Sequence, residues 1–155
     1  MNLKHITAIL VLTGMLFSGN TLADDLSDVM KVIQQYGDLE NDLAAQAKLM
    51  RSDRVYISGG VRQTDEAKNM ANQITGRQAG ESLNGGKTIF VTMIEDPEVS
   101  IYGKTAVASF VRWWQVYPHR KPSNLSSPTW VTLVLVKEKS KWLIAHTHIS
   151  GVGGN

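Results

Sequence analysis

The sequence predicts an α+β domain whose sheet is largely antiparallel. Residues with helical periodicity are confined to the first half of the chain, whereas the second half consists of segments rich in β-branched and aromatic residues. Short turns separate these later segments, as they separate antiparallel strands. Such a sheet must cover one of its faces, and the amphipathic helices of the first half are the segments available to do so.

Three helices are expected before residue 76. The first begins after a capping Asp25 and ends at Gly37, as a glycine just beyond a helix does. A second follows over residues 43–50, and a third begins after Thr64 or Asp65 and ends before Gly76. Apolar residues three or four positions apart predict each helix: Leu26, Val29, Met30 and Ile33, then Leu43, Ala44, Ala47 and Met50, then Ala67, Met70, Ala71 and Ile74.

Six strands are expected, the first of them short. It spans residues 54–58 and is stopped by Gly59 and Gly60. The other five follow in close succession, over residues 87–95, 99–102, 105–117, 129–137 and 142–150. Turns are predicted at residues 96–97, 102–104 and 138–141, and a long loop bounded by prolines at residues 118–128.

The N-terminus has the pattern of a secretory signal peptide. Lys4 precedes an apolar stretch over residues 6–17, and Thr21-Leu22-Ala23 resembles a cleavage site. Cleavage there would leave residues 24–155 as a single domain, with a retained N-terminal anchor as the alternative. The chain has no cysteine, which excludes disulfides, a thiol nucleophile and a lipoprotein anchor. We therefore expect a periplasmic or secreted protein that does not contact the membrane after cleavage.

Composition also limits the possible partners. The formal net charge is only +2, and no long run of lysine or arginine is present. Nucleic-acid binding needs several clustered phosphate contacts, so we do not expect it. No nucleophile motif or phosphate-binding loop is found, and no cofactor is expected.

Several stretches resemble the SnoaL-like, nuclear-transport-factor-2-like superfamily. In that superfamily a Gly-Asp pair between two helices precedes a first strand that ends in glycine, and the chain matches it with Gly37, Asp38, Leu49, Asp53, Val55, Ile57 and Gly59. The last strand resembles the association domain of calcium/calmodulin-dependent kinases and its bacterial relatives, W-x-I-x-H-x-H-x-S-G, through Trp142, Ile144, His146, His148, Ser150 and Gly151. Residues 96–115 resemble the middle strands of the same group.

The resemblance implies a cone-shaped fold, in which a strongly curved, mostly antiparallel sheet wraps around N-terminal helices and encloses a pocket. It also implies a homodimer or a larger homo-oligomer. Two departures bear on activity. Residues 51–54 read Arg-Ser-Asp-Arg where relatives often carry an acidic pair, and the strands expected at 105–117, 129–137 and 142–150 contain no carboxylate. The aspartate base and the protonated aspartate of a ketosteroid isomerase therefore have no counterpart here.

The histidine pair of the last strand has three interpretations. Strict alternation puts His146 and His148 on the side of Trp142, Ile144 and Ser150. They could line the pocket, supply two ligands of a metal site, or be buried structural residues at a subunit interface. No further metal ligand is obvious in the strands, so no metal is expected.

Arg112 is the other unusual residue, because an arginine inside a long apolar strand must be paired or solvated. Alternation puts it on the side of Phe110 and Trp114, with Trp113 opposite. The resemblance suggests that it lines the pocket, where its planar fork could hold a carboxylate or phosphate. The alternative is a position at the pocket mouth, over Trp114.

The function that we expect is binding of a small, polar-headed molecule in the pocket. Arg112, His146 and His148 would contact the polar part, and Trp114, Trp130 and Tyr56 the apolar part. Acid–base catalysis with a histidine as proton carrier is the first alternative, and a non-catalytic assembly module is the second.

Overall fold

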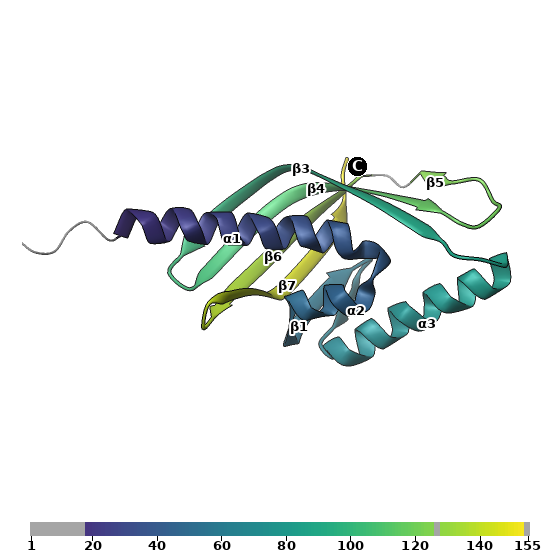
Figure 1. The fold of residues 1–155 in the computed structure, drawn as a ribbon, viewed down its shortest axis with the longest axis horizontal. Helices are drawn as coiled ribbons and strands as arrows, with labels where there is room; N and C mark the ends of the chain where they lie inside the picture. The colour runs from purple at the N-terminus through teal and green to yellow at the C-terminus, as the bar shows by residue number, and fades with distance from the viewer. Residues whose placement is uncertain (1–17, 126–127, 154–155) are drawn as a thin grey trace, which may run out of the picture.

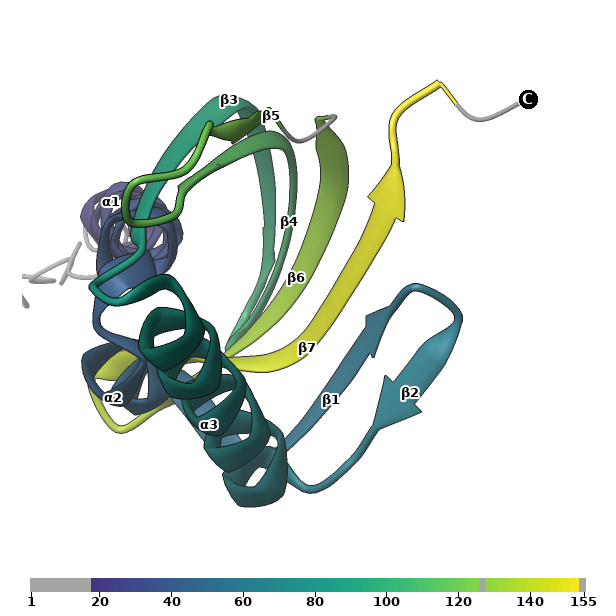
Figure 2. The same ribbon diagram turned by 90° about the vertical axis from the view of Figure 1, so that its right-hand side faces the viewer.

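The computed structural model describes residues 18–125 and 128–153, and shows a curved sheet with its helices on the concave side (Figures 1 and 2). This arrangement confirms the predicted α+β class. Residues 1–17, most of the predicted signal peptide, lie outside the described residues. None of the described helices is long and apolar enough to cross a membrane.

The described helices all lie before residue 85, ahead of the long strands of the sheet. The 3-10 turns η1 (Leu39–Asn41) and η2 (Ala47–Leu49) flank the shortest of them. The α-helices are α1 (Ser18–Asp38), α2 (Leu43–Gln46) and α3 (Glu66–Asn84). Asp65, one of the two predicted caps, does cap α3: its side chain accepts a hydrogen bond from the backbone N–H of Lys68.

The described strands form one seven-stranded sheet in the order β2-β1-β7-β6-β4-β3, with β5 paired to the far end of β4. All neighbours are antiparallel except β1 and β7, which are parallel. The strands are β1 (Met50–Ser58), β2 (Val61–Gln63), β3 (Ile89–Tyr102), β4 (Thr105–Tyr117), β5 (Asn124–Leu125), β6 (Thr129–Glu138) and β7 (Lys141–Gly151).

Two glycines that were expected to end helices lie inside them. A Cβ at Gly37 would stand 3.1 Å from Ile94 Cδ1, so the missing side chain lets α1 approach β3 closely. Gly76 lies in the middle of α3, which continues to Asn84 and ends at Gly85 in the left-handed conformation, with φ 71°. Both helices are therefore longer than predicted, and α3 gains two turns that border the cavity described below.

The two strands expected at 87–95 and 99–102 are one strand, β3. Its pairing with β4 shifts register between Glu95 and Glu98, and Asp96 has φ 49°. Asp96 and Pro97 thus form a β-bulge rather than the predicted turn, because β4 is long enough to pair with both halves of β3.

The core lies between α1 and the concave faces of β4, β6 and β7. Side chains that alternate along each strand point inward, as period-two packing requires. The buried apolar residues are Val29, Val32, Ile33 and Tyr36 from α1, and Ala106, Ala108, Phe110, Val131, Leu133, Leu135, Trp142, Ile144 and Ile149 from the sheet, joined by Met50.

Asp25 anchors α1 to the sheet instead of capping it. Its carboxylate accepts hydrogen bonds from Lys137 Nζ and, at 3.3 Å, from Trp142 Nε1. The bond from Lys137 holds the pKa of Asp25 below its ordinary value. Asp25 lies well inside α1, so the helix begins earlier than a cap at this position would allow.

Candidate functional site

A cavity of about 520 Å³ lies between α3 and the concave face of the sheet. Figure 2 shows α3 and the strands between which this cavity lies. Residues from η1, β1, α3, β3, β4 and the adjoining loops line it: Glu40, Tyr56, Ser58, Asn72, Gln73, Gly76, Arg77, Gly80, Asn84, Thr88, Phe90, Arg112, Trp114, Val116 and Pro118. A volume of this size suits a small organic molecule.

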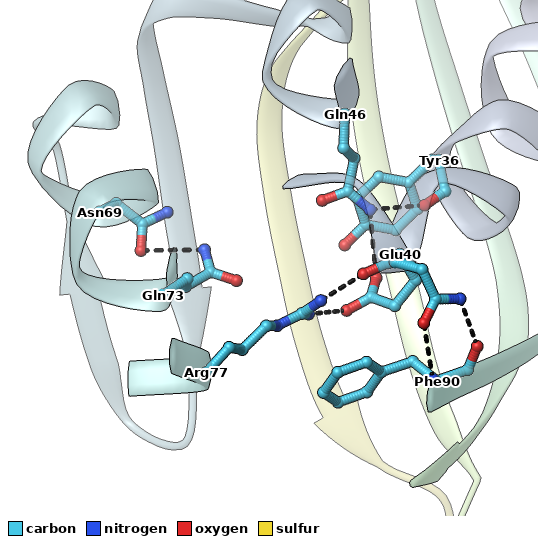
Figure 3. A network of polar contacts seen from close by, with 8 residues as sticks. Tyr36, Glu40, Gln46, Asn69, Gln73, Arg77 and Phe90 are labelled. Atoms are coloured by element: carbon cyan, nitrogen blue, oxygen red, sulfur yellow. Dashed lines mark hydrogen bonds and ion pairs between the residues drawn. The ribbon is translucent and has the colours of Figure 1, made fainter. Parts of the chain in front are cut away.

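One wall is a polar face of α3. Gln73 and Arg77 line the cavity, and the buried Asn69 lies one turn before them on the same face of the helix (Figure 3). Gln73 Nε2 donates to Asn69 Oδ1 at 3.4 Å. Gly76 and Gly80, which also line the cavity, present no side chain, and this widens the cavity along the last turns of α3.

Arg77 joins this wall to the end of α1. Its guanidinium donates to the backbone carbonyl and to the carboxylate of Glu40, and its Cζ lies 4.0 Å from the centroid of the Phe90 ring (Figure 3). Gln46 Nε2 donates to Glu40 Oε2 at 3.1 Å and to the carbonyl of Tyr36 at 2.6 Å. The charge of Glu40 is therefore neutralised by a fixed partner and held by a second donor.

Arg112 and Trp114 form the opposite wall, on the concave face of β4. Trp114 stacks on Phe90 with ring centroids 5.4 Å apart, and Arg112 Cζ lies 5.7 Å from the Trp114 ring. Arg112 Nε and Trp114 Nε1 are buried, and neither has a hydrogen-bond partner among the described residues. An unpaired buried donor costs about 1–3 kcal/mol, so both groups favour an acceptor from outside the protein.

The cavity carries a positive charge. Among its lining residues only Glu40, Arg77 and Arg112 are charged, which gives a net charge of +1 (two positive, one negative). Glu40 is paired with Arg77, whereas Arg112 has no carboxylate within ion-pair distance in the described part of the chain. The uncompensated charge is thus that of Arg112.

Two tyrosines stand near these groups. Tyr36 is buried on α1, and burial raises its pKa to about 12, against the opposing effect of the Arg112 charge. The hydroxyl of Tyr36 therefore stays protonated at neutral pH. Tyr56 lines the cavity from β1, and its ring lies 5.1 Å from the guanidinium carbon of Arg54.

Strict alternation assigned the histidine pair to the wrong face of β7. Val134 pairs with His146 but Leu135 pairs with Ile144, so Ala145 is an extra residue in β7. This β-bulge reverses the alternation: Ile144 and Thr147 are buried on the concave side, whereas His146 and His148 lie on the convex face opposite Val134 and Thr132. Neither histidine lines the cavity.

Three of the remaining candidate residues border the cavity and one does not. Arg112, Trp114 and Tyr56 border the cavity from β4 and β1, although their contact with a ligand stays a prediction. Trp130 is 47% exposed and pairs with Val111 and Ser150 on the convex face, so it lies away from the cavity. Asp53, a carboxylate of β1, does not line the cavity either: it is exposed and ion-paired to Arg51, which lowers its pKa.

No group of three or more His, Cys, Asp or Glu residues that could hold a metal ion is found within residues 18–125 and 128–153. The interpretation of His146 and His148 as metal ligands therefore gains no third ligand from the described residues.

Sequence reasoning missed Glu40, Gln73 and Arg77. A third helix that ended at Gly76 would not carry Arg77, and only the continuation of α3 brings that residue to the cavity. The polar repeat Asn69, Gln73, Arg77 shows in the sequence that these side chains share one helix face, but only the structure shows that this face borders the cavity.

Replacing Gly76 and Gly80 with alanine is expected to stabilise the protein by up to about 1 kcal/mol at each site, since glycine is a poor helix former. A Cβ at either position would meet no heavy atom within 4 Å, so it would only take up cavity space. Urea unfolding measures the gain. Gly59→Ala is the matched control: it also has open space, but φ 57° makes alanine destabilising there. Equal effects at all three positions would contradict this interpretation.

Comparisons with known proteins place the fold. No protein-family profile and no curated protein sequence matches the chain. Among solved structures, it is similar to an NTF2-like protein with a cystatin-like fold from Novosphingobium aromaticivorans, with TM-score 0.70 and 17% identity over 88% of this chain and 87% of that one.

A candidate ketosteroid isomerase from Shewanella frigidimarina has TM-score 0.59 and 18% identity, over 77% of this chain and 92% of that one. A candidate dehydratase of the NTF2-like family from Streptomyces avermitilis has TM-score 0.69 and 14% identity, over 86% and 99%. At these identities the likeness concerns architecture alone. The chain therefore has the cone-shaped fold of the nuclear-transport-factor-2-like proteins.

Proposed function

We propose that this protein binds a small, polar-headed molecule in the cavity between α3 and the sheet. The observation that carries the proposal is the pair of buried N–H donors, Arg112 Nε and Trp114 Nε1, that lack partners among the described residues at the cavity wall. An acceptor on the ligand would satisfy both. Solved structures of the same fold include a candidate isomerase and a candidate dehydratase, which supports a cavity used for small molecules.

The two ends of the ligand would meet different surfaces. Its polar head would contact Arg112 and Trp114, while Phe90, Val116 and Tyr56 offer apolar contact to its body. Gln73 and Asn72 on α3 are available for further hydrogen bonds. Such a division, with few polar groups fixing the orientation in a mostly apolar site, is typical of ligand pockets.

Replacing Arg112 with alanine is expected to abolish the rise in melting temperature that a bound ligand produces. A library of small molecules is screened by thermal shift against the purified protein, and each ligand found is retested on Arg112→Ala. Arg62→Ala is the control, since Arg62 is exposed on β2 and borders no part of the cavity. Ligands that stabilise all three proteins equally would show that binding occurs elsewhere.

The acid–base alternative, with His146 or His148 as the proton carrier, is not favoured by the geometry. Both histidines lie on the convex face, and the described lining of the cavity contains no histidine. Its single carboxylate, Glu40, is held by Arg77 and Gln46.

We further propose that a second copy of the chain covers the convex face, giving a homodimer. This face exposes apolar residues on three neighbouring strands: Val91, Met93, Val107 and Trp130. The likeness of the last strand to the kinase association domains, through His146 and His148, supports self-association as well, although that finer relationship stays a proposal.

Trp130→Glu is expected to convert the dimer to a monomer, because it would bury a charge at the apolar contact. Size-exclusion chromatography with light scattering measures the mass. Leu83→Glu, an equally apolar-to-acidic change at an exposed residue on α3, should leave the dimer intact. A wild-type monomer would refute the proposal.

Export stays part of the proposal and rests on the pattern of residues 1–23. A mature N-terminus at Asp24, read by mass spectrometry of the protein from its producing cells, would support it; an intact Met1 would refute it.

A further inference from the structure

The chemistry of the cavity wall indicates which polar head the ligand carries. Arg112 contributes the only charge in the described lining that has no partner, and Trp114 contributes a neutral N–H donor two residues further along the same face of β4. A group that satisfies both must accept hydrogen bonds from two directions and favour one positive charge. We propose that the head group is a carboxylate, bound by Arg112 and Trp114 together. This inference rests on the proposed function and adds the chemical class of its ligand.

Aromatic side chains lie beside the arginine. Arg112 lies on the same face as Phe110, which is fully buried, and its Cζ is 5.7 Å from the Trp114 ring. Trp114 is in turn stacked on Phe90, which lies against the guanidinium of Arg77. Stacking therefore positions the indole N–H of Trp114 before a ligand arrives, which lowers the entropy cost of binding. An arginine fork matches the geometry of a carboxylate, and the indole N–H can serve one of its oxygens.

The charge balance distinguishes a carboxylate from a dianion such as a phosphate monoester. The lining has a net charge of +1, so a single negative charge brings it to neutrality. A second negative charge would be left without a cation, because Arg77 is engaged by the carboxylate and the carbonyl of Glu40. In a partly buried site that excess is costly.

A neutral head group would leave the charge of Arg112 uncompensated. An amide or ketone oxygen would satisfy a donor, but the Arg112 charge would remain without a counter-ion inside a site lined by Phe90, Trp114 and Val116. Hydrogen bonds to a charged group are stronger than those between neutral groups by about a factor of two. We therefore expect the carboxylate to bind at least about tenfold more tightly than the matching amide.

The test compares benzoate, benzamide and phenylphosphonate, which share a phenyl body and differ in the charge of the head group. Binding to the wild-type protein is measured by isothermal titration calorimetry at a pH slightly above neutral, where the phosphonate is largely a dianion. Benzoate should bind more tightly than both others. Benzamide binding as tightly as benzoate would overturn the carboxylate assignment while leaving small-molecule binding in the cavity intact, and tighter binding of phenylphosphonate would overturn it in favour of a dianion.

Two variants locate the effect. Arg112→Gln should weaken benzoate at least about tenfold and leave benzamide nearly unchanged. Trp114→Phe, which keeps an aromatic ring beside Phe90 but removes the indole N–H, should weaken benzoate by several-fold. Arg62→Gln removes the same charge from an exposed position and controls for long-range attraction. If Arg112→Gln does not fold, the wild-type comparison and Trp114→Phe decide. Unchanged benzoate affinity in Trp114→Phe, or no benzoate binding to the wild-type protein at millimolar concentration, would overturn the inference; the thermal-shift screen judges the broader binding function separately.

Discussion

Replacing Arg54 with methionine is expected to lower the free energy of unfolding by about 3–5 kcal/mol, the cost of leaving one member of a buried ion pair alone. Arg54 is only 2% exposed; its Nε donates to Glu66 Oε2 at 2.7 Å, and its Nη1 donates to Thr147 Oγ1 at 3.3 Å. It thus connects β1 with the first turn of α3 and with β7. Without it, the carboxylate of Glu66 would stay buried with neither oxygen paired, since Glu66 Oε1 already lacks a partner in the described structure.

Urea unfolding followed by circular dichroism measures this loss. The double variant Arg54→Met with Glu66→Met should recover most of it, because two apolar side chains of similar volume remove the unpaired charge. Arg62→Met, at an exposed arginine on β2, should change stability by less than about 0.5 kcal/mol. A double variant as unstable as the single one would show that Arg54 stabilises the fold through packing rather than charge pairing.

Replacing Phe110 with alanine is expected to cost about 3–5 kcal/mol, the range for deleting a buried aromatic side chain. Phe110 is fully buried in the middle of β4, where it pairs with Val131 and belongs to the core between the sheet and α1. The loss combines the hydrophobic transfer free energy of the deleted ring with the cost of the cavity that it leaves. It should also weaken ligand binding, because Phe110 precedes Arg112 on the same face.

The matched control is Ser109→Ala, at the neighbouring residue of β4 whose side chain lies on the opposite, exposed face. This substitution should change stability by no more than about 0.5 kcal/mol. Chemical unfolding of both variants gives the comparison. A loss at Phe110 below about 1 kcal/mol would mean that the core collapses around the missing ring, and that the ring does not hold β4 in place.

The sequence predicted the sheet well where alternation is unbroken. The bounds of β4 agree with the expected 105–117, and Arg112, Phe110 and Trp114 share the concave face as alternation requires. Trp113 lies on the opposite face and donates to Glu95 Oε2 at 2.7 Å. The faces of Arg112 and Trp114 were predicted correctly because no bulge in β4 interrupts the alternation before Trp114.

In β7 the same reasoning failed at one residue. The bulge at Ala145 depends on pairing with β6, which is a property of two strands that no local pattern reveals. Every side chain after it changes face, which moved His146 and His148 out of the expected pocket. The predicted helix ends were wrong for a related reason. Gly37 and Gly76 are of the residue type that often ends a helix, but tertiary packing keeps α1 and α3 helical through these positions.

The two glycines of α3 also bear on how this cavity could change over evolutionary time. Most alterations of a binding site lower stability, so a new specificity usually requires compensating substitutions elsewhere. Here Gly76 and Gly80 border the cavity at positions where an added Cβ would favour the helix and meet no heavy atom within 4 Å. A single substitution of either glycine in a descendant of this chain could therefore narrow the range of molecules that bind and raise the free energy of unfolding at the same time.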